Sequence, residues 1–376
     1  MRIGFYAPLK SPFSDSVSGD RTIARLLIRA LEIGGHEVLL MSEFRSVSIS
    51  GDEFQQQDLA HHGQKVVSEM LDDPNHMVHS IDIWLTYHLY HKAPDWLGPQ
   101  ASEALNIPYV VTEASYAPKQ MAGPWQLGLK QVEKCLSVAS GVISLNPRDV
   151  ECIQSLLKPD AKQMLLAPFA ADSPDFSDSP ESTKQTMSAK YRLKPTCPWI
   201  ITVAMMRPGD KLKSYLTLAD ALERITDLDW QLVVVGGGSE KDQIVKAFSN
   251  TTKRVCFTGV LEETDIAQLL TAADVFAWPA INEAFGMAIL EAHRHGLPVV
   301  AGYTDGVAAT VADTRTGFLT PAGDPVSFAN ALSALIQDVS IRAQMAKNAR
   351  DIFLERHTVE LAAETIQLFL SQIKTQ

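Results

Sequence analysis

Two glutamates follow a predicted strand at the point where a helix begins, and this segment of the chain is the one best suited to chemistry. Between Trp278 and Val300 an apolar strand ends, a loop carries Glu283, and a helix containing Glu291 begins near residues 284–286. The start of a helix offers unpaired backbone N–H groups and a positive dipole end to a phosphate or a sugar oxygen. Carboxylates beside it suit hydroxyl groups. The alternative for this segment alone is that Glu283 caps the helix and Glu291 is solvated.

Two permanent cations follow another apolar strand. Arg207 and Lys211 come directly after the run at residues 199–204. Ligands of open α/β sheets bind at the carboxyl ends of the strands, so these two side chains are placed to clamp a diphosphate. The alternative is that they are ordinary loop cations beside Asp210.

Two glycine loops are further candidates for close approach to a ligand. Residues 236–238 are three glycines that end a buried strand, and Gly237 lies at their centre. A dinucleotide fingerprint is disfavoured here, because Lys241 stands in its third glycine position and Cys256, rather than an acid, lies about twenty residues on. Gly19 lies between the first strand and the first helix, where it suits a phosphate. The alternative is plain N-capping by the preceding serine.

Short Val/Ile-rich runs alternate with helical patterns along the whole chain, which predicts parallel sheets covered by helices on both faces. The fold class is therefore α/β. Six strands are expected in the first half, at residues 2–7, 37–41, 81–87, 109–113, 141–145 and 164–168. Six more are expected in the second half, at residues 199–205, 230–235, 255–258, 275–278, 298–301 and 317–319.

The segment between the two sets of strands predicts the domain boundary. Residues 170–186 are rich in Ser, Asp and Pro and lack apolar periodicity, so we expect an interdomain linker there. This gives a first domain at residues 1–169 and a second at residues 187–356. The last segment, 357–376, has apolar residues at helical spacing and is expected to form a helix that packs on either half.

Composition excludes several functional classes. The chain has 376 residues, 46% hydrophobic and 20% charged, and a formal net charge of −11, which disfavours nucleic acid as a partner. Its four cysteines have no CxxC spacing, so free buried thiols are expected rather than disulfides or a zinc site. The sequence contains no apolar run long enough for a membrane span, and residues 1–9 do not resemble a signal peptide. We therefore expect a cytoplasmic protein with at most peripheral membrane contact.

The segment from Glu283 to Glu291, followed by Gly-Leu-Pro-Val-Val, resembles the E-x7-E signature of retaining glycosyltransferase family 4. Other residues match that family's pattern in the same order along the chain. Arg207 and Lys211 match its Arg and Lys, residues 236–238 its glycine-rich turn, Gly259 its F-x-G strand end and Gly19 its N-terminal glycine loop. The resemblance covers nearly all of the second half and, more loosely, the first.

The resemblance implies the GT-B fold, two Rossmann-like doubly wound domains facing across a cleft, with the C-terminal helix returning to the first domain. It implies that Glu291 holds the ribose hydroxyls of a nucleoside diphosphate sugar and that Arg207 and Lys211 hold its diphosphate. Glu283 would hold the sugar together with the N–H groups of Ala284, Phe285, Gly286 and Met287.

These roles need no metal and no cofactor besides the sugar donor. Two cations and a helix N-terminus stabilise the charge that develops on the leaving diphosphate. The function implied is a retaining, metal-independent hexosyltransferase of polysaccharide, glycolipid or glycoconjugate synthesis, with a sugar, lipid-linked or small-molecule acceptor. Two alternatives stay open. One is another GT-B nucleotide-sugar enzyme, a hydrolase or epimerase, and the other is a non-catalytic sugar-nucleotide-binding protein.

The chain departs from the family pattern in the first domain. Many members carry a histidine at the end of the fourth strand, whereas this chain has Glu113, which we expect to contact the sugar or the acceptor. His88, at the end of another strand, is a further candidate for the acceptor site, with a structural role as the alternative. The base and sugar of the donor, the acceptor and the oligomeric state do not follow from the sequence.

Overall fold

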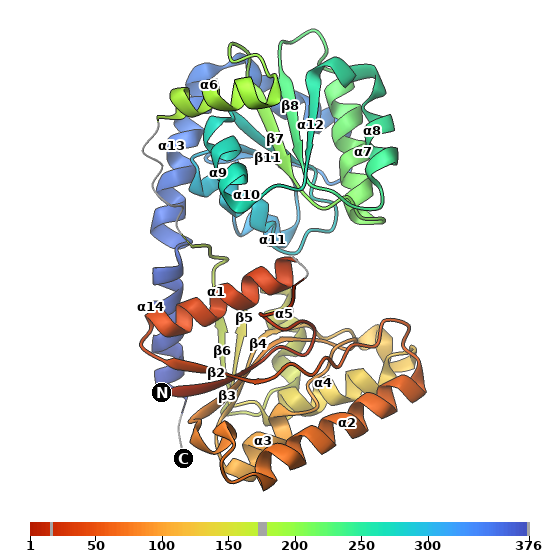
Figure 1. Ribbon diagram of the computed structural model, residues 1–376, viewed down its shortest axis with the longest axis vertical. Coiled ribbons are helices and arrows are strands. Elements are labelled where there is room, and N and C mark those ends of the chain that lie inside the picture. Colours follow the sequence, from red (N-terminus) through yellow and green to blue (C-terminus); the bar gives the residue numbers. More distant parts are fainter. Residues whose placement is uncertain (16–17, 172–178, 374–376) are drawn as a thin grey trace. The chain divides into compact units, whose positions relative to one another are not determined.

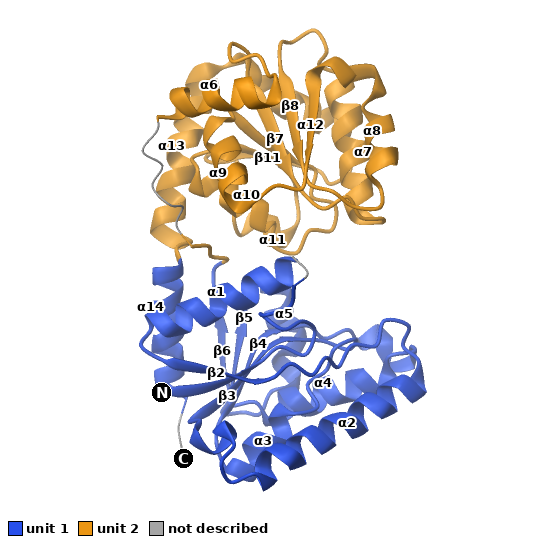
Figure 2. Ribbon diagram, in the orientation of Figure 1, with its two compact units in different colours: residues 1–167, 359–376 blue, residues 168–358 orange. Residues whose placement is uncertain are grey.

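The computed structural model describes residues 1–15, 18–171 and 179–373. The chain forms two compact units, coloured separately in Figure 2. Unit 1 contains residues 1–167 and 359–376, and unit 2 contains residues 168–358. The C-terminal helix α14 (Val359–Ser371) thus belongs with the first half of the chain, and it lies beside α1 (Gly19–Ile33) in Figure 1.

Unit 1 is built on a six-stranded parallel sheet in the order β2-β1-β3-β4-β5-β6. Its strands are β1 (Arg2–Tyr6), β2 (Glu37–Ser42), β3 (Ile83–Leu89), β4 (Tyr109–Ala114), β5 (Gly141–Ser144) and β6 (Lys162–Leu165). Besides α1 and α14, its helices are α2 (Glu53–Asp72), α3 (Gly98–Leu105), α4 (Gln126–Val138) and α5 (Pro147–Ile153).

Unit 2 is a second six-stranded parallel sheet, in the order β12-β11-β10-β7-β8-β9. Its strands are β7 (Trp199–Val203), β8 (Gln231–Val235), β9 (Val255–Gly259), β10 (Val275–Trp278), β11 (Val299–Gly302) and β12 (Gly317–Thr320). Its helices are α6 (Pro180–Tyr191), α7 (Asp210–Glu223), α8 (Lys241–Ala247), α9 (Glu263–Ala272), α10 (Met287–Arg294), α11 (Asp305–Ala308), α12 (Pro325–Gln337) and α13 (Val339–Arg356).

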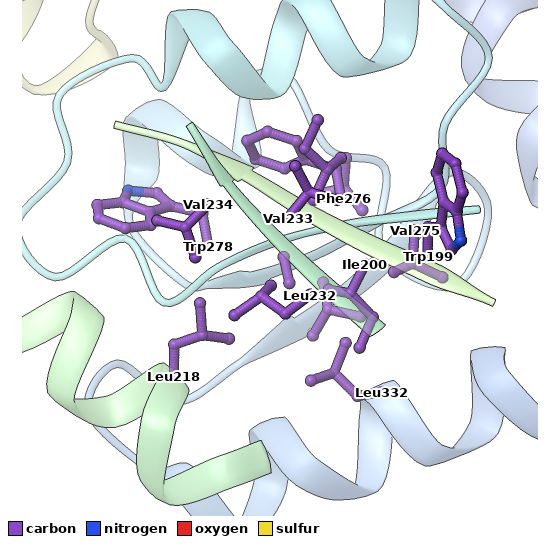
Figure 3. Packing of buried hydrophobic residues seen from close by; sticks show 14 of the residues in the cluster. Trp199, Ile200, Leu218, Leu232, Val233, Val234, Val275, Phe276, Trp278 and Leu332 are labelled. Atoms are coloured by element: carbon purple, nitrogen blue, oxygen red, sulfur yellow. The ribbon is translucent and has the colours of Figure 1, made fainter. Parts of the chain in front are cut away.

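The strands form because their side chains are apolar on both faces, as in sheets covered on both sides by helices. In unit 2 the residues of β8 and β10 are all buried, and their side chains pack with Leu218 of α7 and Leu332 of α12. Figure 3 shows these side chains together, with Trp199 and Trp278 at opposite ends of the cluster. Each unit therefore has its own core.

Each strand order reverses direction once, and this fixes where ligands can bind. In unit 1 the chain goes from β1 to β2 on one side and then to β3 on the other; in unit 2 it goes from β7 to β8 and β9 and then crosses to β10. The loops that leave the two central strands diverge at such a point and open a crevice at the carboxyl edge of the sheet. The strand order reverses between β1 and β3 in unit 1 and between β7 and β10 in unit 2. We refer to these two places as the β1/β3 crevice and the β7/β10 crevice.

The predicted α/β class and all twelve strands are confirmed, with ends that differ by a few residues. The strand expected at residues 164–168 is found at Lys162–Leu165. Part of the expected linker 170–186 is helical, because Ser179 caps and Pro180 begins α6, while residues 172–178 lie outside the described residues. All four cysteines are free as predicted, but Cys152 is exposed rather than buried.

The part of the chain that the structure describes contains no helix that is both long and apolar enough to span a membrane.

Candidate active site

Lys211 and Glu283 meet at the β7/β10 crevice of unit 2. Lys211 lies in the first turn of α7, after β7, and Glu283 lies in the loop that follows β10. Lys211 Nζ is 2.5 Å from Glu283 Oε2, and the two side chains are 26% and 19% exposed. The structure thus brings together two residues that are 72 positions apart, at the place where an open α/β sheet binds its ligand.

Trp278, the last residue of β10, supports this ion pair. Its indole N–H donates to Glu283 Oε2 at 3.1 Å, and Lys211 Nζ lies 5.1 Å from the centre of one of its rings. A cation over an indole face is attracted by the electrons of the ring. Because Trp278 is itself buried, it fixes the position of both charges.

The loop that carries Glu283 is tied to α7. The Ile281 N–H donates to Ser214 Oγ at 3.1 Å, and Asn282 Nδ2 donates to Asp210 Oδ2 at 3.1 Å. Ala280 and Asn282 have φ of 52° and 54°, a left-handed conformation that is costly for alanine. The contacts to α7 hold the loop in this shape, so Glu283 is positioned before any ligand binds.

The backbone beside Glu283 offers a row of free donors. The helix α10 begins at Met287, slightly later than expected, and its N-cap Gly286 has φ of 66°. Among the described residues we find no acceptor for the backbone N–H groups of residues 284–287. Glu283 does not cap this helix, so that alternative is wrong. The helix start that the sequence predicts is therefore present, with unpaired N–H groups at Ala284, Phe285, Gly286 and Met287, an arrangement that suits an oxyanion.

Glu291 lies about one turn into α10. Its side chain is only partly exposed, and burial is the main reason why its pKa is raised above its usual value; Arg294 on the same helix opposes this effect. A freely solvated residue would not have its pKa shifted by burial, so the alternative of a solvated face residue is wrong. A half-buried carboxyl group of this kind suits hydrogen bonds to hydroxyl groups.

The three glycines after β8 are needed to hold the cation-bearing loop. A Cβ atom at Gly236 would lie 2.0 Å from the carbonyl oxygen of Ala204, and one at Gly238 would lie 2.2 Å from that of Met206. The Met206 N–H donates to the Gly237 carbonyl at 2.9 Å. A Cβ atom at Gly237 itself would meet only the Val260 side chain, so the positions where space demands glycine are its two neighbours.

Other predicted residues of unit 2 lie nearby but have less defined roles. Arg207 is exposed and makes no ion pair with any described residue, so the structure does not join it to the Lys211–Glu283 pair. Gly259 ends β9 with φ of 79°, and its carbonyl accepts from the Gly236 N–H at 2.9 Å. Both residues are at the carboxyl edge of the sheet, as predicted.

In unit 1 a hydrogen-bonded pair of side chains lies at the β1/β3 crevice. His88 Nδ1 is 2.9 Å from Asp20 Oδ1, and these residues come from β3 and from the first turn of α1. Gly19 begins α1, where open space surrounds its α-carbon, and Ser18 caps the helix by accepting from the Arg21 N–H at 3.3 Å. The capping alternative for this segment is therefore correct, although it leaves Gly19 accessible.

Glu113 lies on β4, next to β3. Its side chain is 5% exposed, and its Oε2 accepts from the Leu145 N–H at 3.2 Å. Burial, with the nearby Asp149 carboxylate as the second cause, raises the pKa of Glu113 to about 8. Glu113 and His88 are thus at the same edge of the same sheet, as the acceptor-site prediction requires.

Sequence reasoning missed the residues that support the site. Ser214 and Asp20 act through contacts with residues far away in the sequence, and Trp278 contacts the distant Lys211 as well as the nearby Glu283. Local sequence patterns do not predict the long-range contacts. Gly306 is a fourth case, because a Cβ atom there would lie 1.5 Å from the Ala284 carbonyl oxygen. Gly306 lies in the short helix α11, where no local sequence pattern predicts this close approach.

Comparison with known proteins agrees with this geometry. Residues 183–352 match the family model described as "Glycosyl transferases group 1". This part of the chain is thus similar in sequence to the group 1 glycosyl transferases. The matched residues include Lys211, Trp278, Glu283 and Glu291, so the candidate site lies within them.

Sequence similarity to curated relatives extends beyond residues 183–352. The chain is 26% identical over 310 residues to a D-inositol 3-phosphate glycosyltransferase of Xylanimonas cellulosilytica, an alignment that covers 78% of this chain and 72% of that protein. It is 35% identical over 134 residues to the protein of the same name from Corynebacterium diphtheriae, which covers 34% of this chain and 31% of that one. The identity is thus higher over a shorter stretch of the chain.

Solved structures share the fold over the whole chain. Sucrose-phosphate synthase from Thermosynechococcus elongatus superposes with a TM-score of 0.74 at 19% identity and covers 99% of this chain and 98% of its own. The Anabaena protein HepE, solved in complex with UDP, gives a TM-score of 0.73 at 21% identity, with 99% of this chain and all of that chain covered. The chain has the GT-B fold, with a Rossmann-like α/β sheet in each unit.

Proposed function

We propose that the chain is a retaining, metal-independent glycosyltransferase that moves a hexose from a nucleoside diphosphate sugar to an acceptor hydroxyl. The observation that carries this proposal is the Lys211–Glu283 pair at the β7/β10 crevice, beside the unpaired N–H groups of residues 284–287. A permanent cation and a helix start suit a diphosphate, and a fixed carboxylate suits the hydroxyls of a sugar. The similarity of residues 183–352 to the group 1 glycosyl transferases supports the same assignment.

The proposed reaction follows from this charge distribution. When the bond between the anomeric carbon and the diphosphate oxygen breaks, the electron pair leaves with the diphosphate, whose charge Lys211 and the helix start stabilise. The acceptor oxygen forms the new bond to the anomeric carbon on the face that the leaving group vacates. The acceptor proton passes to the departing phosphate oxygen, so no separate base is required.

Glu291 and Arg207 have supporting roles in this proposal. Glu291 holds the ribose hydroxyls, and Arg207, which is exposed, turns toward the diphosphate when the donor binds. Gly19 in unit 1 allows close approach of the donor. The same proposal includes a cytoplasmic location. Membrane contact would be at most peripheral, because the net negative charge of the chain disfavours adhesion to an anionic membrane.

The first test is nucleotide binding. A thermal-shift panel of UDP, GDP, ADP and NAD, each with and without EDTA, should show that one nucleoside diphosphate raises the melting temperature whether or not EDTA is present. A ligand at 100 times its Kd stabilises the folded state by about 2.7 kcal/mol, which such a panel detects. Stabilisation by NAD alone, or only when a metal ion is available, would overturn the proposal.

The second test is turnover by matched lysine variants. Lys211→Ala should lower kcat/KM by about 100-fold or more, the usual cost of one donor to a developing negative charge. Lys213→Ala is the control, because Lys213 lies in the same helix but its side chain is 63% exposed and pairs with Asp210. Equal activity of the two variants would refute the role of Lys211. Donor turnover that does not depend on added acceptor would favour a hydrolase or epimerase.

A further inference from the structure

Four ionisable side chains gather at the carboxyl edge of the unit 1 sheet. Asp20 pairs with His88 at 2.9 Å, and Asp149 of α5 accepts from Ser115 Oγ at 3.2 Å. Glu113 lies on β4, close enough that both aspartates raise its pKa. No set of three or more His, Cys, Asp or Glu side chains among the described residues is arranged to hold a metal ion. The cluster therefore combines three carboxyl groups with one imidazole, and these four side chains are not arranged as metal ligands.

The backbone is strained at two of these residues. His88 and Glu113 have φ of 63° and 61°, and neither is a glycine. They are cross-strand neighbours, since Leu89 of β3 pairs with Ala114 of β4. A left-handed conformation costs a non-glycine residue of order 1–3 kcal/mol and persists where the surrounding structure enforces it, most often at functional sites. Two such residues at matching positions of adjacent strands indicate that the fold presents this pair of side chains to a ligand.

Glu113 is set up to carry a proton. It is almost fully buried, and one oxygen is already occupied by the Leu145 N–H. Burial and the two neighbouring aspartates all disfavour its ionised form, so its pKa of about 8 leaves it protonated at neutral pH. The titratable groups that act on it or lie beside it are Asp20 on α1, Tyr87 and His88 on β3, and Asp149 on α5.

We propose that His88 and Glu113 form one hydroxyl-binding pair, in which the Glu113 carboxylic acid donates a hydrogen bond to a sugar hydroxyl and the outer nitrogen of His88 binds the same or the adjacent hydroxyl. Asp20 occupies Nδ1 of His88, which leaves Nε2 for the ligand. The pair sits at the β1/β3 crevice, where a ligand of this sheet would bind. A phosphate is unsuitable here because Asp20 and Asp149 would repel it.

Aromatic rings next to the pair also suit a sugar. Tyr90 lies 5.0 Å from the His88 ring, and His91 and Trp125 follow in edge contacts at 5.5 and 5.6 Å. Apolar ring faces beside hydroxyl-binding groups are what a carbohydrate, with its C–H and O–H faces, requires. The ligand class is thus a neutral sugar, either the acceptor or the hexose being transferred. This inference rests on the proposed function.

The experiment compares Glu113→Gln, Glu113→Ala and wild type in steady-state kinetics from pH 6 to 9.5, with donor and acceptor varied separately. Wild-type activity should fall as the pH rises through about 8, because the ionised carboxylate can no longer donate. Glutamine keeps a donor at every pH, so the activity of Glu113→Gln should lack this alkaline decline. Glu113→Ala should raise one KM by tenfold or more.

The substrate whose KM rises identifies the source of the hydroxyl. A higher KM for acceptor alone assigns the pair to the acceptor, whereas a higher KM for donor, also seen in donor hydrolysis without acceptor, assigns it to the transferred hexose. Asp149→Asn should move the alkaline decline to lower pH, because removing the neighbouring negative charge makes Glu113 easier to ionise. A merely structural role of Glu113 would not produce that shift.

Controls separate the possible failures. Glu133→Gln alters a partly buried carboxyl group of unit 1 that pairs with Tyr116 instead, and it should behave as wild type. Nucleoside diphosphate binding by each variant, measured by thermal shift, verifies that unit 2 is folded. An alkaline decline that persists in Glu113→Gln, or unchanged KM values in Glu113→Ala, overturns this inference alone. A wild type that turns over no nucleoside diphosphate sugar overturns the proposed function and this inference with it.

Discussion

Replacing Glu113 by glutamine should make the protein increasingly more stable than wild type as the pH rises. The side chain is 5% exposed, and its pKa rises from 4.5 to about 8 on folding. Below pH 4.5 both the folded and the unfolded chain carry the proton, so the difference in pKa does not change the unfolding free energy with pH. Between pH 4.5 and 8 the unfolded chain gives up the proton while the folded chain keeps it, so wild-type stability is lost as the pH rises.

The size of the effect follows from the same two pKa values. Each unit of pKa corresponds to about 1.4 kcal/mol, so this group alone should lower the wild-type unfolding free energy by about 2.5 kcal/mol between pH 5 and pH 7. Glutamine cannot ionise, and Glu113→Gln should therefore gain that amount relative to wild type over the same interval. Urea unfolding of both proteins at pH 5, 6 and 7, followed by circular dichroism, measures the difference.

The pH dependence separates charge from packing in this experiment. A change in packing or in the hydrogen bond to the Leu145 N–H would shift the stability of Glu113→Gln by the same amount at every pH. A difference between variant and wild type that stays constant from pH 5 to pH 7 would thus refute the claim that the folded protein holds Glu113 in its protonated form.

Two further predictions concern unit 2. Gly238→Ala should destabilise it and abolish nucleotide binding, because the new Cβ would lie 2.2 Å from the Met206 carbonyl oxygen; Gly237→Ala should keep its melting temperature within a few degrees, since the exposed Val260 side chain can move away. His293→Leu should gain stability relative to wild type on acidification. Burial lowers the pKa of His293 to about 3, so its neutral form stabilises the fold above pH 6.5 and this contribution is lost toward pH 3, by about 2.5 kcal/mol between pH 6 and pH 4. Denaturant unfolding at pH 4, 5 and 6 checks the second prediction, and an unchanged difference across these pH values contradicts it.

The sequence was sufficient to predict the strands and the carboxyl edge of each sheet, where ligands of open α/β sheets bind. Runs such as Trp-Ile-Ile-Thr-Val at residues 199–203 are apolar on both faces, and only a sheet covered on both sides buries them. Composition misled at residues 180–186, which the expected linker includes because the whole segment 170–186 is rich in Ser, Asp and Pro. The signal for a helix was present there, as a serine N-cap followed by a proline in the first turn.

Side-chain contacts within the site were beyond sequence reasoning. The spacing of Glu283 and Glu291 predicted a helix start with carboxylates, but not that Glu283 would bind Lys211 and the Trp278 indole instead of capping the helix. Likewise no local pattern shows that His88 and Glu113 adopt left-handed backbone conformations. Such features arise from packing between segments far apart in the chain, which a single sequence does not specify locally.

The two units share one topological feature, a single reversal of strand order, but differ in the charged side chains that lie there. Each sheet has one crevice at its point of reversal, and each crevice is bridged by one pair of side chains, the hydrogen-bonded Asp20–His88 in unit 1 and the Lys211–Glu283 ion pair in unit 2. In unit 2 the permanent cation stands beside free helix N–H groups, an environment that attracts a diphosphate. In unit 1 the imidazole is outnumbered by carboxyl groups, which repel phosphate but bind hydroxyls. Under the proposed function, charge rather than fold therefore decides which of the two similar sheets takes the nucleotide and which takes the sugar hydroxyl.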